Sequence, residues 1–91
     1  MSVNVKIPTQ LRPLVGGAAQ VEATGETLDG VIADLGERFP GVAARLLDET
    51  GALRRFVNLY VDDEDVRFLQ GLETPVQPGS SVTIIPAIAG G

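Results

Sequence analysis

The sequence predicts an α+β domain in which a mixed sheet of four to five strands packs against one main helix. Three stretches have the two-residue alternation or β-rich composition of strands, and one stretch between them has the spacing of an amphipathic helix. A chain of 91 residues is long enough for one domain with a modest core. We therefore expect a single layered domain with little room for an enclosed active site.

The first expected strand covers residues 2–7, where polar and apolar side chains alternate. This period of two is typical of a half-buried strand with one face toward the core. Pro8 ends the strand because proline has no backbone N–H to donate. Residues 11–17 contain one proline and two adjacent glycines, which predict a turn or loop. A second strand is expected from about Ala18 to Ala23, joined to the first by a hairpin or by a wider loop.

The main helix is expected to begin after Thr27, which is a good N-cap residue. Asp29 in the first turn places a negative charge where it favours the helix dipole. The apolar residues that follow lie on one helical face: Leu28, Val31, Ile32, Leu35 and Phe39. Pro40 is the stop signal. A shorter helical pattern begins at Val42 and ends between Asp48 and Gly51.

Residues 55–61 are the most β-prone run in the middle of the chain. The two faces of this strand carry Phe56, Asn58 and Tyr60 on one side and Val57, Leu59 and Val61 on the other. Both faces are largely apolar, and two interpretations stand side by side. Either the helix covers one face and leaves Phe56 and Tyr60 partly exposed as a docking patch, or the strand is covered on both faces.

Four acidic residues follow, at positions 62–65, and then a short strand is expected at residues 66–68. A calcium site is one interpretation of the acidic run, but its spacing does not fit the EF-hand loop and it contains no glycine at the bend. A solvated hairpin turn is the favoured interpretation. Residues 68–76 are irregular, and Gln77-Pro78-Gly79 predicts a turn before the last strand, residues 81–85.

The last strand leads through Pro86 into a tail that ends in Gly90-Gly91. We expect a folded domain at residues 1–86 and an extended tail at residues 87–91. Five extended residues reach roughly 16 Å, at about 3.3 Å per residue. Glycine has no Cβ, so the end of the tail can pass through a narrow channel. The alternative is a frayed terminus without function, because many chain ends are poorly ordered.

The composition excludes several classes of function. The sequence has neither cysteine nor histidine, so disulfides, thiolate metal sites and the commonest general base are missing. We expect no bound metal, no bound cofactor and no catalysis by the chain itself. A net charge of −5 argues against nucleic acid as a partner. No apolar run reaches the length of a membrane span and no signal peptide is present, so the expected location is the cytoplasm, with no membrane contact.

The expected order of elements is strand, strand, helix, small helix, strand, short strand, strand. If the first and last strands pair in the centre of the sheet, the helical crossover makes them parallel. This arrangement is a β-grasp, the ubiquitin-like fold.

A β-grasp domain that ends in Gly-Gly resembles the ubiquitin-like sulfur carriers, the MoaD/ThiS-like family. Three blocks of sequence carry the resemblance: residues 1–8, 55–68 and 82–91. The central block is the most specific of them, and together they are most similar to the CysO-like carriers of actinobacteria. Residues 16–23 and 47–53 are variable loops by this comparison, and they leave the pathway open.

The resemblance implies chemistry at the C-terminal carboxylate of Gly91. An E1-like adenylating enzyme would activate it with ATP, and sulfur would then replace AMP to give a thiocarboxylate. Gly90, Ala89 and Ile88 would guide the tail into partner enzymes. The acceptor would be a sulfur-incorporating synthase, such as the pyridoxal-phosphate cysteine synthase of cysteine biosynthesis, with a zinc protease releasing the product. The chain would thus be a protein co-substrate.

The interpretation also includes a candidate surface for partner proteins and leaves other functions open. Phe56, Tyr60 and Ile85 are the candidate docking surface, although core packing explains them equally well. Three alternatives to a sulfur carrier in cysteine biosynthesis also stand: a protein modifier joined to lysines through Gly91, the small subunit of molybdopterin synthase, and a β-grasp module that only binds other proteins.

Overall fold

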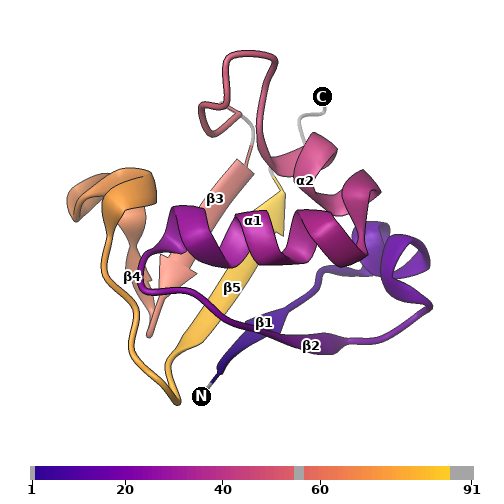
Figure 1. Ribbon diagram of the computed structural model, residues 1–91, viewed down its shortest axis with the longest axis horizontal. Helices are drawn as coiled ribbons and strands as arrows, with labels where there is room; N and C mark the ends of the chain where they lie inside the picture. Colours follow the sequence, from indigo (N-terminus) through magenta and orange to yellow (C-terminus); the bar gives the residue numbers. More distant parts are fainter. Residues whose placement is uncertain (1, 55–56, 87–91) are drawn as a thin grey trace.

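A computed structural model describes residues 2–54 and 57–86. A five-stranded mixed sheet, with strand order β2-β1-β5-β3-β4, lies against helix α1, and α2 follows at the C-terminal end of α1 (Figure 1). The strands are β1 (Val3–Lys6), β2 (Gln20–Ala23), β3 (Val57–Val61), β4 (Glu64–Asp65) and β5 (Ser81–Pro86). The helices are α1 (Leu28–Arg38) and α2 (Pro40–Leu46), and the short 3-10 helices are η1 (Thr9–Val15), η2 (Val66–Phe68) and η3 (Gly71–Glu73).

Strand β5, the last in the sequence, is the central strand of the sheet. It pairs in parallel with β1, where Val5 lies opposite Val82, and antiparallel with β3, where Leu59 lies opposite Ile84. The helices supply the crossover that parallel strands require. The predicted β-grasp fold, with its first and last strands paired in parallel, is confirmed.

Helix α1 forms where its sequence pattern predicts. The Thr27 side chain caps it by accepting a hydrogen bond from the backbone N–H of Gly30, at 3.3 Å. The backbone carbonyl of Thr74 accepts a second hydrogen bond, from the N–H of Leu28, at 3.0 Å. The helix ends at Arg38, with Phe39 as its C-cap, and Pro40 begins α2 because proline fits the first turn of a helix.

One core fills the space between the helices and one face of the sheet. Along β3 the side chains alternate, so that Val57, Leu59 and Val61 are buried while Asn58 and Tyr60 are half-buried on the opposite face. Fully burying an aliphatic side chain such as Leu59 contributes about 1.5–3 kcal/mol. The interpretation in which β3 is covered on one face and partly open on the other is the one that the structure supports.

Two segments differ from the sequence-based expectation. Residues 9–15 form a 3-10 helix rather than a loop, and its end is fixed by Gly16 in the left-handed conformation. Residues 66–68 form η2, so the prediction of a strand there was wrong. The Asp65 carboxylate accepts a hydrogen bond from the backbone N–H of Arg67 at 2.9 Å, which turns the chain out of the sheet after the two residues of β4.

Within residues 2–54 and 57–86, no helix has the length and apolar character needed to cross a membrane. The predicted tail, residues 87–91, lies outside the described residues, and so its separation from the domain stays a prediction.

Candidate functional site

The C-terminal half of β5 positions the segment that the sequence singles out. Pairing with β1 covers residues Ser81 to Thr83, whereas pairing with β3 continues to Pro86, opposite Val57. Ile84 is only 3% exposed and holds the strand to the core. The last described residue of the chain is therefore attached to the middle of the sheet through β3.

Four candidate residues follow this point: Ile88, Ala89, Gly90 and Gly91. They lie outside the described residues, as does the candidate docking residue Phe56. Five residues follow Pro86 in the sequence, and fully extended they would reach roughly 16 Å. This length would carry the terminal carboxylate well beyond the end of β5.

The other end of β5 is held by the acidic turn between β3 and β4. The backbone N–H of Ser81 donates to the Asp62 carboxylate, and the N–H of Asp62 donates to the Ser81 carbonyl, both at 2.9 Å. Asp62 and Asp63 both have positive φ, at 49° and 72°, as in the tight turns that Asp tolerates. The favoured interpretation of a hairpin turn is confirmed, and the described part of the chain places no three His, Cys, Asp or Glu side chains so that they could hold a metal ion.

The sheet face opposite the helices carries the two candidate docking residues that the structure describes. Tyr60 lies opposite Thr83 across the β3–β5 pair, and Ile85 lies two residues further along β5. Side chains in this diagonal relationship are about 7–8 Å apart on one face. Ile85 is 45% exposed and Tyr60 is half-buried. The structure thus brings Tyr60 and Ile85 together on an accessible surface beside the end of β5.

Arg67 ties η2 to the start of β3. Its guanidinium donates from Nη2 to the carbonyl of Val57, at 3.0 Å, and from Nη1 to the side-chain oxygen of Asn58, at 2.7 Å. Because Val57 and Asn58 pair with Pro86 and Ile85, this arginine braces the part of the sheet from which the C-terminal segment continues. Sequence reasoning missed this role, since a residue spacing of nine or ten has no recognisable pattern.

The loop after α2 stands at the same end of the sheet. Asp48 organises it by accepting hydrogen bonds from the hydroxyl of Thr50, at 2.6 Å, and from the backbone N–H groups of Thr50 and Ala52. These bonds, led by the one from the Thr50 hydroxyl and assisted by the charge of Arg54, lower the pKa of Asp48 below its ordinary value of 3.8. The loop is thus fixed by an ionised carboxylate.

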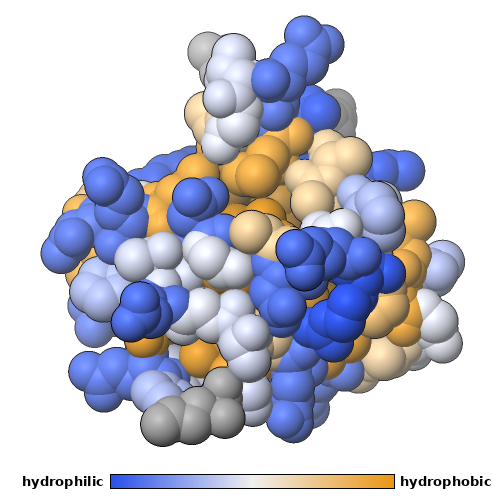
Figure 2. Space-filling view, viewed as in Figure 1, coloured by the Kyte–Doolittle hydropathy of each residue, from blue (hydrophilic) through white to orange (hydrophobic). Residues whose placement is uncertain are grey.

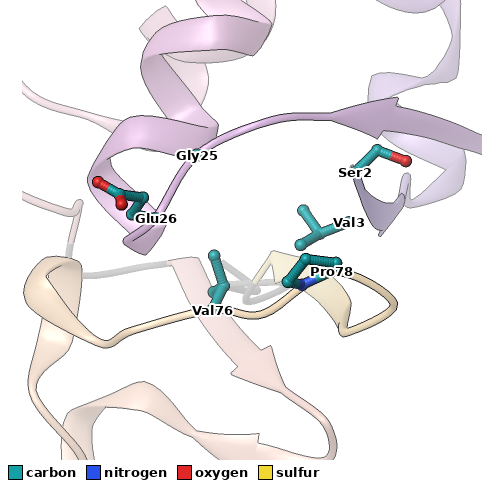
Figure 3. Close-up of a pocket in the computed structure, with 6 residues that line it drawn as sticks. All are labelled: Ser2, Val3, Gly25, Glu26, Val76 and Pro78. Atoms are coloured by element: carbon teal, nitrogen blue, oxygen red, sulfur yellow. The ribbon is translucent and has the colours of Figure 1, made fainter.

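A pocket of about 530 Å³ lies at the opposite end of β5 from Pro86, between Ser2 and Val3 at the start of the chain, Gly25 and Glu26 before α1, and Val76 and Pro78 before β5 (Figure 3). The Ser2 hydroxyl is not paired with the Glu26 carboxylate. It donates instead to Glu22, which lies outside this pocket, at 3.1 Å. What the structure presents at the other end is an anchored strand end beside an accessible sheet face.

The sequence was also compared with known proteins. The model of the ThiS family matches residues 5–91. The sulfur carrier protein CysO of Mycobacterium tuberculosis is 55% identical over 93 residues, which cover 100% of both chains. The similarity therefore extends over the C-terminal residues that the structure leaves undescribed.

Solved structures show the same relationship. CysO in the Amycolatopsis orientalis BexX/CysO complex is similar with a TM-score of 0.91 and 52% identity, over 98% of this chain and 99% of that one. The small archaeal modifier protein 1 of Methanosarcina acetivorans has a TM-score of 0.85 and 26% identity, over 99% and 96% of the two chains.

Proposed function

The chain belongs to the ThiS family, and we propose that it is a sulfur carrier protein that reacts through the C-terminal carboxylate of Gly91. The observation that carries this proposal is the full-length similarity to CysO, at 55% identity. The geometry supports it, because β5 is anchored in the centre of the sheet and ends five residues before the reacting carboxylate. The folded domain then serves as the part that partner enzymes hold.

The chemistry follows from the poor reactivity of a carboxylate toward nucleophiles. An E1-like enzyme joins the Gly91 carboxylate to the α-phosphate of ATP, and pyrophosphate leaves. Sulfide then attacks the carbonyl carbon of the acyl-adenylate, and AMP leaves with the C–O bonding electrons. The product is a thiocarboxylate, whose sulfur is ionised near neutral pH and is strongly nucleophilic. ATP is consumed by the partner and is not a resident cofactor of the carrier.

The tail enters partner enzymes through the residues before Gly91, which are Gly90, Ala89 and Ile88. The two glycines adopt whatever backbone conformation the enzyme channel imposes, because neither has a Cβ. Ile88 is the one anchor-sized side chain of the last five residues. The absence of side chains at the end of the tail allows a partner enzyme to bind it in a narrow channel.

Cysteine biosynthesis is the pathway that we propose, because the relatives at 52% and 55% identity are named CysO. The sulfur acceptor would be a pyridoxal-phosphate cysteine synthase, on which the thiocarboxylate sulfur adds to an aminoacrylate. The resulting thioester would rearrange by a shift of the acyl group from sulfur to the amino nitrogen. A zinc protease would then hydrolyse the new amide bond, which releases cysteine and restores the Gly-Gly end. In this scheme the chain is a co-substrate, and catalysis belongs to its partners.

Intact mass spectrometry tests the proposed function directly. The chain is incubated with ATP, the activating enzyme of its own organism and sulfide, and its mass should rise by the difference between sulfur and oxygen. Omission of ATP is the control, and it should leave the mass unchanged. An unchanged mass in the complete mixture would contradict the proposal.

The same experiment in cell extract distinguishes a protein modifier from a sulfur carrier. The similarity to small archaeal modifier protein 1 is the observation that supports the modifier as a second candidate function. Isopeptide-linked adducts between Gly91 and lysines of other proteins would favour the modifier. A free chain that carries the thiocarboxylate would favour the carrier, and co-migration with a larger subunit in gel filtration would favour the molybdopterin synthase subunit.

A further inference from the structure

Two adjacent apolar side chains, Phe68 and Leu69, are exposed to solvent. The Phe68 side chain is 87% exposed and that of Leu69 is 41% exposed. Neither residue contributes to the core, so folding gives no reason for an aromatic ring at this position. Aromatic side chains that a partner can bury are among the anchors that dominate protein interfaces.

The backbone around Phe68 is fixed on both sides. Before it, Val66 is fully buried and the Asp65 carboxylate accepts the N–H of Arg67, whose guanidinium binds Asn58 on β3. After it, the N–H of Leu69 donates to the carbonyl of Val66 at 3.0 Å. The backbone at Phe68 therefore needs little further ordering when a partner binds.

Carboxylates lie beside Leu69, while the exposed Arg67 precedes Phe68. Leu69 lines a groove of about 550 Å³ together with Asp62 and Glu64, and Glu73 follows on η3, next to the groove residue Thr74. Figure 2, viewed as Figure 1, shows hydrophobic surface among hydrophilic side chains at the edge where η2 and η3 lie. Like charges gathered beside an apolar residue favour a partner with the opposite charge.

The groove beside Leu69 lies at the other end of β5 from Pro86. It is lined by Val61, the last residue of β3, and by Ser80, which precedes β5, whereas Pro86 is the last residue of β5. A strand of six residues spans about 17 Å. A protein that binds in this groove can therefore leave the C-terminal segment free to enter a channel.

We propose that Phe68, Leu69 and the neighbouring carboxylates form a docking surface for the adenylating enzyme. The enzyme would present an apolar hollow for the Phe68 ring, with lysine or arginine side chains around it. This inference rests on the proposed function. The reason for a distant contact is that Gly90 and Gly91 have no side chains, so an enzyme that selects this carrier has to recognise the folded domain.

Adenylation kinetics with full-length variants test the inference. Phe68→Ser should raise the KM for the carrier about 10-fold or more, with kcat at saturation unchanged, because the ring contributes to binding and not to chemistry. Glu64→Lys and Glu73→Lys should raise KM by a smaller factor that shrinks at high salt. The matched control is Glu37→Lys, which makes the same charge change at an exposed position of α1 and should leave KM unchanged.

The outcomes separate the two proposals. If the wild-type chain is not adenylated, the proposed function fails and the docking surface fails with it. If the wild-type chain is adenylated and Phe68→Ser has the wild-type KM, only the docking surface is overturned. Equal KM values for Glu64→Lys and Glu37→Lys would likewise overturn the charge complementarity. Circular dichroism and melting temperature should match wild type for Phe68→Ser, because its side chain is exposed.

Discussion

Arg67 donates a hydrogen bond to the carbonyl of Val57, the residue that pairs with Pro86 at the end of β5. A side chain from η2 thus supplies a hydrogen bond to the backbone at the start of β3. Through this contact, the segment that carries the proposed docking surface and the strand that carries the tail are mechanically connected.

Arg67→Ala should lower the free energy of unfolding by about 1–3 kcal/mol, because the carbonyl of Val57 and the side chain of Asn58 lose a charged donor. Urea denaturation followed by circular dichroism measures the change. Arg45→Ala, at an exposed position of α2, is the control and should change stability by less than about 0.5 kcal/mol. Equal stability of the two variants would contradict the bracing role.

Deletion of Gly91 should abolish ATP-dependent activation while leaving the melting temperature almost unchanged. The deletion shortens the tail by one residue and moves the carboxylate by about 3.3 Å in the enzyme channel, whereas an extended terminus contributes few packed contacts. Pyrophosphate release measures activation, and calorimetry measures the melting temperature. Extension by one residue should block activation in the same way, unless a protease removes it. A large loss of stability would show that the terminus is part of the fold.

Gly25→Ala should destabilise the domain by about 1–3 kcal/mol. A Cβ at Gly25 would lie 2.5 Å from the backbone nitrogen of Val31 and 2.7 Å from the carbonyl carbon of Gly30, and backbone atoms in a helix cannot move aside. Gly30→Ala is the matched control, because its Cβ would have no neighbour closer than 3.4 Å and alanine favours the helix. Thermal unfolding of both variants decides the matter, and a stable Gly25→Ala protein would contradict the close approach.

Asp48 should titrate below its ordinary pKa of 3.8 in the folded protein. Because the folded pKa is the lower one, Asp48 contributes stability above the unfolded pKa, and this contribution is lost as the pH falls through the folded pKa. Carboxyl chemical shifts in an NMR titration measure the value. Thr50→Val removes the hydroxyl donor and should raise the pKa of Asp48. An unchanged pKa of Asp48 in this variant would show that the backbone N–H donors alone are enough to lower it.

Ile85→Ser should weaken the productive interaction with partner enzymes, because it removes an apolar side chain from the accessible face beside the tail. We expect kcat/KM for activation or for sulfur transfer to fall about 5-fold or more. Ile85→Val keeps an apolar side chain and should restore activity. Wild-type values for Ile85→Ser in both reactions would exclude this face from docking.

The sequence predicts the elements whose side chains repeat with a fixed period. The alternation around Val3 and Val5 and the helical spacing from Leu28 to Leu35 follow directly from which face is buried. The last strand was predicted at residues 81–85, and β5 includes these residues and also Pro86, which pairs with Val57. These signals are local, and tertiary contacts reinforce them.

The features of the fold and of the candidate site that the sequence did not predict depend on contacts between distant residues. The change at Asp65 from strand to η2 comes from a side-chain hydrogen bond to the backbone, which competes with the β propensity of the apolar residues that follow. The role of Arg67 and the exposure of Phe68 depend on how η2 folds back along β3. Alternation along residues 55–61 placed Tyr60 on the face opposite Val57, Leu59 and Val61, but only the coordinates show that Ile85 shares this face and that the face is accessible.

The parallel pairing of β1 with β5 has a mechanical consequence. The first and last strands of the chain are neighbours that run in the same direction, so tension applied between the two termini pulls them in opposite senses along their length. Their shared hydrogen bonds then bear the load together in shear, rather than opening one after another. If a partner exerts force on the C-terminal segment during release, this pairing makes the domain resistant to unfolding by that force.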